Sequence, residues 1–300
     1  MEVEKPELDV WVNVSPPLSQ EEFGKLSEEL GIPSDFLSDT LDIDERAHYE
    51  MEDKVKLIII KTPTKNFSFN ESDAYYITIP ISIILTHQQI ITVNSFENEA
   101  IKRFLNSFKN RSPEKRNMMA LKIFEKVVMN FHDHLKEINH HRNALEQELY
   151  DSNRNAELLN LMRIQKSLVY FVTALRSNEL LLMKLQRTNF LGLNEEEKEF
   201  LDDLIVETSQ ALEMANIYTN ILSSTLDAFA SVISNNLNNV MKRLTSITII
   251  LSLPALVVGF YGMNVPIPYQ NSYHAFYIPI ILSLAISVII SWYFMKKKWF

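Results

Sequence analysis

A stretch of 52 residues without a single Asp, Glu, Lys or Arg, between Arg243 and Lys296, constrains this chain more than any other feature. All 38 acidic residues and 24 of the 29 basic ones lie before it, in residues 1–241. Charged residues make up 22% of the sequence, so a wholly soluble protein would hardly leave such a gap. The chain therefore divides into a charged front part and an apolar back part.

The uncharged stretch contains two apolar runs, residues 244–261 and 277–295, joined by a polar, proline-containing segment. Each run has about 18–20 residues, the length that a helix needs to cross the hydrocarbon core of a membrane. Basic residues flank the pair at its outer ends and indicate the cytoplasmic side. These flanking residues are Lys242, Arg243, Lys296, Lys297 and Lys298. We therefore expect a two-span hairpin in the plasma membrane, with both termini in the cytoplasm.

A buried helical hairpin of a soluble protein is the alternative interpretation of these two runs. The flanking charges argue against it, and so do Trp292, Tyr293 and Trp299, which stand where interfacial aromatic residues are expected. Membrane lipid is therefore an expected partner of the back part.

The composition of the front part excludes several classes of function. Its 38 acidic and 24 basic residues give a net charge of −14, which repels phosphate, so we expect no nucleic-acid partner. The absence of Cys excludes a disulfide scaffold and a Cys-ligated metal site. The first residues lack the basic patch and apolar run of a signal peptide. No acid–base pair, nucleophile motif or nucleotide loop stands out, so we predict neither an enzyme nor a bound cofactor.

The front part reads as an α+β domain followed by long helices. Within residues 1–110, β-branched or alternating segments predict strands at 8–14, 55–62, 75–85 and 90–93, and a capping box at 19–22 predicts a helix. An N-cap signal at 112–114 opens a stretch without Gly or Pro from 114 to 191, which predicts long helices with a bend near 151–155.

A single long helix is predicted over residues 195–261. Asn194 followed by three glutamates is an N-cap signal, and no Gly or Pro occurs from Glu195 until Pro254. Such a helix would be about 100 Å long at roughly 1.5 Å per residue. It would run from the acidic cytoplasmic part into the membrane.

Small and hydroxylated residues form one stripe along the first apolar run at helical spacing. They are Thr245, Thr248, Ser252, Ala255 and Gly259. In a lipid environment such a stripe indicates either close helix packing or a water-facing surface. The stripe continues backward through Met241 and Asn238 into an asparagine-rich segment, and these amides favour a pore over simple packing.

The first run ends in Gly262-Met263-Asn264, and here the sequence resembles a known family. Gly-Met-Asn at the outer end of the first of two C-terminal spans is similar to the signature of the CorA family of divalent-cation transport proteins. Its context strengthens the resemblance: Met241-Lys242-Arg243-Leu244-Thr245 opens the span, Pro254 interrupts it, and Lys296-Lys297-Lys298-Trp299 ends the chain. The segments at 37–46 and 90–93 also resemble the family's front domain. The resemblance implies a funnel-shaped homopentamer whose five first spans line a pore.

The resemblance assigns the selectivity filter to Gly262, Met263 and Asn264. Mg²⁺ gives up its water reluctantly, and a ring of neutral amide oxygens can accept hydrogen bonds from the first-shell waters without stripping them. Asn264 would supply that ring, while Gly262 would let the backbone turn at the helix end. An ordinary Gly/Asn helix terminus is the alternative for the bare tripeptide.

Further positions follow from the same resemblance. Asn238, Met241, Leu244, Thr248 and Ser252 match pore-facing positions, with Met241 and Leu244 similar to the family's hydrophobic constriction. Asp39 and Asp203, or its neighbour Asp202, match the carboxylates of a cytoplasmic Mg²⁺-sensing site between subunits. The alternative for each carboxylate is a solvated surface charge. Four histidines, His132, His134, His140 and His141, suggest a metal cluster at first sight, but their spacing favours a solvated helix surface.

The sequence thus predicts seven segments and one leading function. The segments are a cytoplasmic α/β domain (1–110), long cytoplasmic helices (111–193), the cytoplasmic part of the stalk helix (194–243), the pore-lining first span (244–263), an extracytoplasmic loop with the filter (264–276), the second span (277–295) and a basic cytoplasmic tail (296–300). The leading function is a channel that transports Mg²⁺, or Co²⁺. Mg²⁺ is also the expected regulatory ion, acting from the cytoplasm. A related transporter for Zn²⁺, Co²⁺ or Ni²⁺ is the close alternative, and a membrane-anchored scaffold without transport is the alternative from another class.

Overall fold

The computed structural model describes residues 3–4, 11–14, 27, 30–66, 73–87, 89–94, 98–108, 116–152, 155–266, 271–297 and 299. The chain forms two compact units, residues 1–224 and 225–300. One helix, α6 (Glu195–Tyr261), begins in the first unit and ends in the second.

The first unit contains a six-stranded sheet in the order β1-β2-β6-β5-β4-β3. The strands are β1 (Val3–Glu4), β2 (Trp11–Val14), β3 (His48–Glu52), β4 (Val55–Lys65), β5 (Tyr76–Leu85) and β6 (Ile90–Asn94). Neighbouring strands are antiparallel except for β2 and β6, which run parallel. The long β4–β5 hairpin is the centre of the sheet, and β3 forms one edge.

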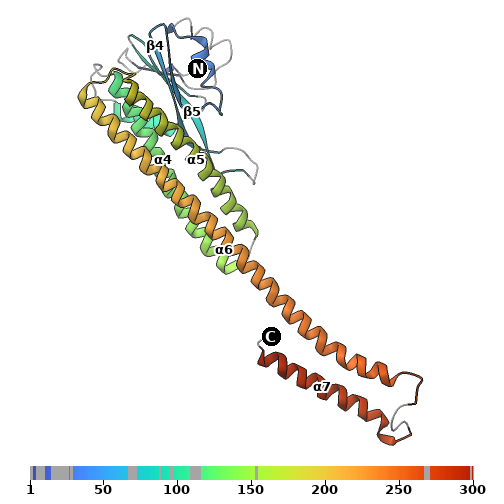
Figure 1. Cartoon of the computed structure of the whole chain (residues 1–300). Helices are drawn as coiled ribbons and strands as arrows, with labels where there is room; N and C mark the ends of the chain where they lie inside the picture. Colours follow the sequence, from blue (N-terminus) through green and yellow to red (C-terminus); the bar gives the residue numbers. More distant parts are fainter. Residues whose placement is uncertain are drawn as a thin grey trace. The chain divides into compact units, whose positions relative to one another are not determined.

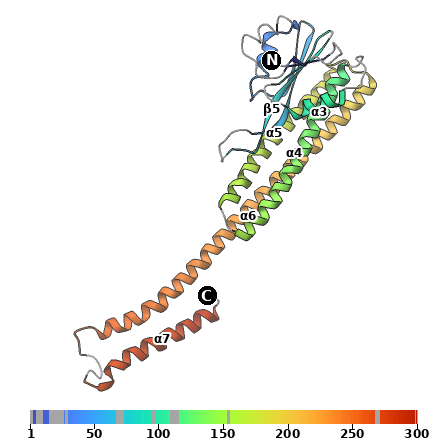
Figure 2. The ribbon, with the colours of Figure 1, turned by 180° about the vertical axis from the view of Figure 1, so that it is seen from behind.

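Helices cover the central hairpin, as Figures 1 and 2 show for α4 and α5. The helices of this unit are α2 (Ser34–Ser38), α3 (Glu99–Phe108), α4 (Arg116–Ser152) and α5 (Asn155–Thr188), together with the beginning of α6. α2 packs on the other face, where Phe36 and Leu37 join Leu57, Ile59 and Ile84 in one buried cluster. Since both faces of β4 are covered, the strand is buried nearly throughout rather than at alternate residues.

Side-chain amides and hydroxyls of the helices fasten them to the sheet backbone. Lys61 of β4 lies opposite Pro80, which has no N–H to donate, and the side chain of Asn178 on α5 supplies both bonds instead. Its Oδ1 accepts from the Lys61 N–H at 2.9 Å and its Nδ2 donates to the Lys61 carbonyl at 2.8 Å. Ser167 of α5 accepts in the same way from the Tyr76 N–H at 3.0 Å. Each such buried group would cost about 1–3 kcal/mol if left without its partner.

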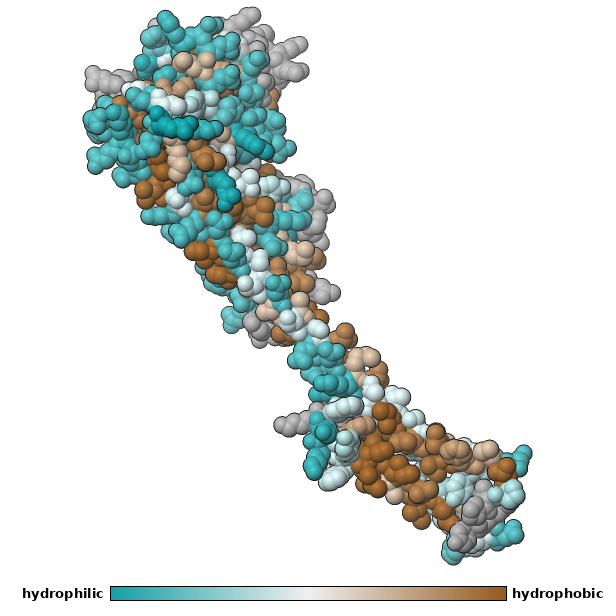
Figure 3. Space-filling view, viewed as in Figure 1, coloured by the Kyte–Doolittle hydropathy of each residue, from teal (hydrophilic) through white to brown (hydrophobic). Residues whose placement is uncertain are grey.

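The second unit contains the end of α6, the short 3₁₀ helix η1 (Tyr273–Phe276) and α7 (Tyr277–Lys296). In both Figure 1 and Figure 2, α7 lies beside the last turns of α6. By length and composition, α6 and the η1–α7 segment each contain a stretch that can cross a membrane. Only 6% and 11% of these stretches are buried, and Leu251, Ile281 and Val288 are each more than 60% exposed. Figure 3 shows the resulting hydrophobic surface.

The exposed apolar surface contradicts the alternative of a buried hairpin. Apolar side chains that stay exposed over two whole helices need lipid or neighbouring subunits to cover them. The fold class expected from the sequence is therefore confirmed: an α+β domain precedes long helices and two C-terminal apolar helices.

Several elements agree with the sequence prediction and others correct it. α6 has the predicted bounds, and β4, β5 and β6 lie where β-branched runs predict them. The expected bend near 151–155 falls where α4 ends at Ser152 and α5 begins at Asn155, and residues 153–154 lie outside the described part of the chain. The helix signals at 19–22 and 112–114 lie outside the described residues, and β3, α2 and α3 were not predicted.

Candidate metal-ion sites

The Gly-Met-Asn tripeptide directly follows the last residue of α6. The Gly262 N–H donates to the Val258 carbonyl at 2.9 Å and the Met263 N–H to the Phe260 carbonyl at 3.3 Å, so two carbonyls of the last helical turn keep backbone partners. Gly262 follows the helix without a left-handed conformation, since only Gly31 and Gly192 have positive φ among the described glycines. A Cβ at Gly262 would lie 3.4 Å from the Val258 carbonyl oxygen, which is a close but ordinary contact.

The side-chain amide of Asn264 lies on the surface of the single chain. The residue is exposed, and within the described residues its side chain makes no hydrogen bond to another protein group. Met263 beside it is 53% exposed. An amide without a protein partner needs water, an ion's hydration shell or another subunit to satisfy it.

The eight positions predicted to face a pore all lie on an exposed part of α6. They are Asn238, Met241, Leu244, Thr245, Thr248, Ser252, Ala255 and Gly259. The Thr248 hydroxyl donates to the Leu244 carbonyl at 2.8 Å, and the Ser252 hydroxyl to the Ile249 carbonyl at 3.1 Å. Because the protons of both hydroxyls are used within the helix, their oxygens are left as acceptors for water. Ser246, one position off the stripe, is buried and donates to the Lys242 carbonyl.

The basic flanks lie at the expected ends of the two apolar helices. Lys242 and Arg243 precede the first apolar stretch on α6, and Lys296 is the last residue of α7. The Lys296 Nζ lies 5.4 Å from the centre of the Trp292 ring, and Trp299 stacks on Phe294 with a ring separation of 5.2 Å. Lys297 follows α7 directly, and Lys298 lies outside the described residues. Cationic and aromatic side chains thus meet at this end of α7, as in an interfacial belt.

In the first unit, Asp39 belongs to a cluster that the sequence did not predict. One ligand atom each from Asp39, His48 and Glu50 lies within 4.8 Å of the others, and no other such group of three occurs among the described residues. Asp39 caps the C-terminus of α2, with its N–H bonded to the Asp35 carbonyl at 3.1 Å. His48 and Glu50 are two residues apart on β3, so their side chains share one face of the strand.

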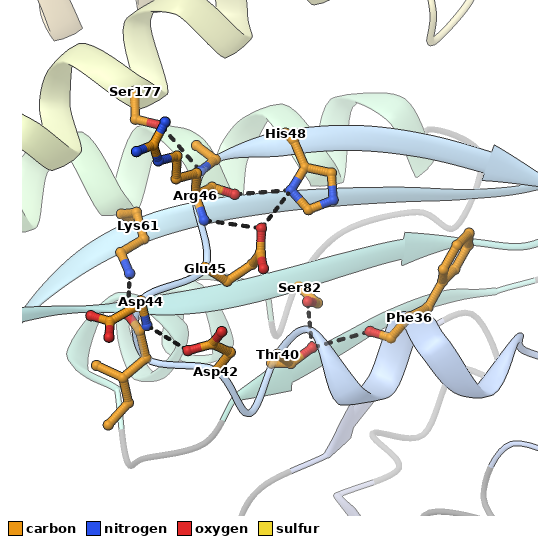
Figure 4. Close-up of polar contacts among 12 residues, drawn as sticks. Phe36, Thr40, Asp42, Asp44, Glu45, Arg46, His48, Lys61, Ser82 and Ser177 are labelled. Carbon is orange, nitrogen blue, oxygen red and sulfur yellow. Dashed lines mark hydrogen bonds and ion pairs between the residues drawn. The ribbon is translucent and has the colours of Figure 1, made fainter.

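Hydrogen bonds hold the segment that joins Asp39 to His48 (Figure 4). The Thr40 hydroxyl pairs with the Ser82 hydroxyl on β5, which fixes the chain just after Asp39. The Ala47 N–H donates to the Ser177 hydroxyl on α5 at 3.1 Å, just before His48. Between them, the Lys61 ammonium donates to the Ile43 carbonyl. The loop is therefore fastened at both ends and in the middle.

The charge around Asp39 is negative. Partial burial raises the pKa of the Asp39 carboxyl above its ordinary value, and the carboxylates of Glu45, Glu50 and Asp35 raise it further, while His48 opposes them. Negative charges that disfavour one another at short range are the arrangement that a bound cation relieves.

The two candidate carboxylates on α6 differ in their surroundings. Asp202 and Asp203 are both exposed and lie outside the Asp39 cluster. Asp202 accepts a hydrogen bond from the Gln186 side chain on α5. Asp203 makes no hydrogen bond or ion pair within the described part of the chain. Asp203 is thus the carboxylate available to a cation or to another subunit.

The α4 histidines do not assemble a metal site. His140 and His141 are exposed, whereas His134 packs edge-on against the Tyr76 ring at 4.9 Å and its Nδ1 lies 3.0 Å from the Asn130 carbonyl. Burial lowers the pKa of His134, against an opposing effect of that hydrogen bond. The expected solvated surface therefore holds for His140 and His141, whereas His132 is partly buried and the expectation is wrong for His134.

Comparisons with known proteins agree with this architecture. The family model for the CorA-like Mg²⁺ transporter protein matches residues 9–297. The cobalt/magnesium transport protein CorA of Methanocaldococcus jannaschii is 27% identical over 303 residues, covering 97% of this chain and 91% of that protein. The protein with the same description from Thermotoga maritima is 22% identical over 294 residues, covering 96% and 83%.

The complete structure of the CorA magnesium transporter from Methanocaldococcus jannaschii has the same fold. It matches with a TM-score of 0.84 at 25% identity, and the match covers 100% of this chain and 94% of that one. Since the family model spans nearly the whole sequence and a complete structure shares the architecture, the chain belongs to the CorA-like family of Mg²⁺ transporter proteins.

Proposed function

We propose that this chain is the subunit of a homopentameric channel that carries divalent cations across the plasma membrane, with Mg²⁺ as the main ion and Co²⁺ as a second one. The observation that carries the proposal is the exposed Asn264 amide, without a protein partner in the described residues, at the end of an apolar helix. The family and the printed function of the two curated relatives support it.

The proposed filter is the ring that five copies of Gly262, Met263 and Asn264 would form. Each Asn264 contributes a neutral carbonyl oxygen, which accepts hydrogen bonds from the waters that Mg²⁺ retains. A ring of carboxylates would bind the ion more tightly and slow its release. The neutral amides can therefore recognise hydrated Mg²⁺ and still release it quickly.

The proposed path continues along the exposed stripe of α6. Thr248 and Ser252 offer hydroxyl oxygens to water, whereas Met241 and Leu244 offer only apolar groups. A ring of such apolar side chains closes a narrow path by expelling water from it. Met241 and Leu244 thus form the proposed gate, and Asn238 is the proposed amide ring before it.

We expect the purified protein to be a homopentamer. A single hairpin of two helices encloses no path, and the exposed pore stripe and apolar surface of the lone chain need further copies to cover them. Mass measurement in detergent should give five times 34.9 kDa after subtraction of the detergent. A monomer or dimer as the only species would contradict the assembly.

Ion flux into liposomes tests the proposed function directly. We expect flux of Mg²⁺ and Co²⁺ into vesicles with the purified protein, and none into vesicles without it. No flux of any divalent ion, at any internal Mg²⁺ concentration, would favour the membrane-anchored scaffold. Flux of Zn²⁺, Co²⁺ or Ni²⁺ but not of Mg²⁺ would favour the related transporter. One observation supports that alternative, because residues 264–277 contain no acidic side chain that could concentrate Mg²⁺ at the outer mouth.

For regulation, we propose that cytoplasmic Mg²⁺ bridges Asp39 of one subunit and Asp203 of the next. Asp39 lies among other carboxylates, and Asp203 has no partner among the described residues of its own chain. Asp203 and Met241 lie on the same uninterrupted helix, so α6 can carry a movement from the bridge to the gate.

A further inference from the structure

We infer that Asp39, His48 and Glu50 form a cation site within a single subunit, and that this site takes Co²⁺, Ni²⁺ or Zn²⁺ in preference to Mg²⁺. The site goes beyond the proposed function, because it needs neither a neighbouring subunit nor the pore. It shares Asp39 with the proposed Mg²⁺ bridge but adds an imidazole and excludes Asp203, so the two ions would compete for the Asp39 carboxylate.

The geometry of the three side chains is close to that of an occupied site. Ligand nitrogen and oxygen atoms lie about 2.0–2.2 Å from a bound Zn²⁺, so two ligands of one ion are at most roughly 4.4 Å apart. The three ligand atoms here already lie within 4.8 Å of one another. Small side-chain rotations therefore suffice to bring them around one ion, with water in the remaining positions.

A hydrogen bond orients the His48 ring. Its Nδ1 lies 2.9 Å from the Arg46 carbonyl, which can only accept, so Nδ1 is the donor of this hydrogen bond. The Glu45 carboxylate lies 3.4 Å from the same nitrogen. Nε2 is then the nitrogen left for a metal ion. A carbonyl or carboxylate behind the coordinating imidazole is the usual support of a histidine ligand.

The charge balance also favours a dication. Asp39 and Glu50 supply two negative charges, and no Lys or Arg among the described residues forms an ion pair with either of them. The ammonium of Lys61 is near Asp42, Asp44 and Glu45, but it donates to the Ile43 carbonyl. One divalent ion would offset the two carboxylates without displacing any of these contacts.

The donor set decides which dication binds. Mg²⁺ prefers oxygen ligands and keeps most of its waters in an octahedral shell. Imidazole nitrogen suits Co²⁺, Ni²⁺ and Zn²⁺, whose affinities for a mixed nitrogen–oxygen site exceed those of Mg²⁺. His48 therefore gives this site a preference that a pair of carboxylates alone would not have.

Co²⁺ binding to the full-length protein in detergent tests the inference. Equilibrium dialysis against Co²⁺, with Mg²⁺ in large excess, should give one tightly bound Co²⁺ per chain and a visible absorption spectrum of bound Co²⁺. His48→Gln and Glu50→Gln should each weaken this binding about tenfold or more, the scale found even for residues that only orient a metal ligand. Glu50 is exposed, so its replacement carries little risk to folding.

His141→Gln is the matched control, because His141 is an exposed histidine on α4 outside the cluster. It should bind Co²⁺ as the wild type does. Unchanged Co²⁺ affinity in both His48→Gln and Glu50→Gln, or displacement of the bound Co²⁺ by Mg²⁺ at comparable concentration, would overturn the inference. Flux measured on the same preparations keeps the two proposals apart, since Co²⁺ binding that depends on His48 stands whether or not ions are transported.

Discussion

Asn264→Ala should reduce Mg²⁺ flux to the level of vesicles without protein while the assembly stays intact. Each subunit contributes one amide oxygen to the proposed filter, so a single substitution removes the whole ring. The side chain is exposed and has no hydrogen-bond partner among the described residues, so its loss should cost the fold little. Mg²⁺ flux into liposomes, together with mass measurement in detergent, checks both parts of the prediction.

Asn271→Ala is the control for Asn264→Ala. Asn271 is also exposed and precedes η1 on the other side of the same loop, but it is not part of Gly-Met-Asn. This variant should keep most of the wild-type flux. If Asn264→Ala assembles and transports Mg²⁺ at the wild-type rate, the role given to Asn264 is wrong.

The sequence predicts the long apolar and helical elements well because their signals are local. The 52 uncharged residues and the absence of Gly and Pro over 195–253 specify α6 and α7 without help from the rest of the chain. The β4–β5 hairpin is predictable for the same reason, since its strands are long and rich in β-branched residues.

The sequence analysis missed elements that form only because other parts of the fold pack or pair with them. β3 has the sequence His-Tyr-Glu-Met-Glu, which lacks the apolar alternation of a half-buried strand, because β3 is a sheet edge and none of its residues is buried. It is a strand because β4 pairs with it, with His48 opposite Ile59 and Glu50 opposite Leu57. The junction between α4 and α5 has neither Gly nor Pro, yet the polar residues at 151–155 placed it correctly as a bend between long helices.

The proposed filter and the Asp39 cluster also differ in how far the sequence alone can identify them. Gly262, Met263 and Asn264 are consecutive, so a motif can identify them. Asp39 meets His48 and Glu50 only because α2 packs on β4 and because β3 is extended, which places residues two apart on one face. A histidine and a glutamate two residues apart could have indicated this site. That spacing places both side chains on one face only if the segment is a strand, and β3 was not predicted.

Asp203→Lys should make channel closure need much less internal Mg²⁺, or none. Each front part carries a net charge of −14, so five of them repel one another unless cations bridge them. In the proposed mechanism, Mg²⁺ between Asp39 and Asp203 of neighbouring subunits holds the ring closed, and loss of the ion loosens it. A lysine at position 203 supplies a tethered positive charge in place of the ion, so the closed state is favoured without Mg²⁺.

Asp39→Asn combined with Asp203→Asn should have the opposite effect and weaken inhibition by internal Mg²⁺. Neutral amides neither repel one another nor hold the ion firmly, so the closed state loses the ligand that stabilises it. Asp202→Asn is the parallel variant, because the Asp202 carboxylate already accepts a hydrogen bond from Gln186, and it should follow the wild type. The measurement is flux against internal Mg²⁺ with transition metals removed by a chelator, so that the site at His48 stays empty. Superimposable inhibition curves for wild type, Asp203→Lys and the double variant would show that these carboxylates are only surface charge.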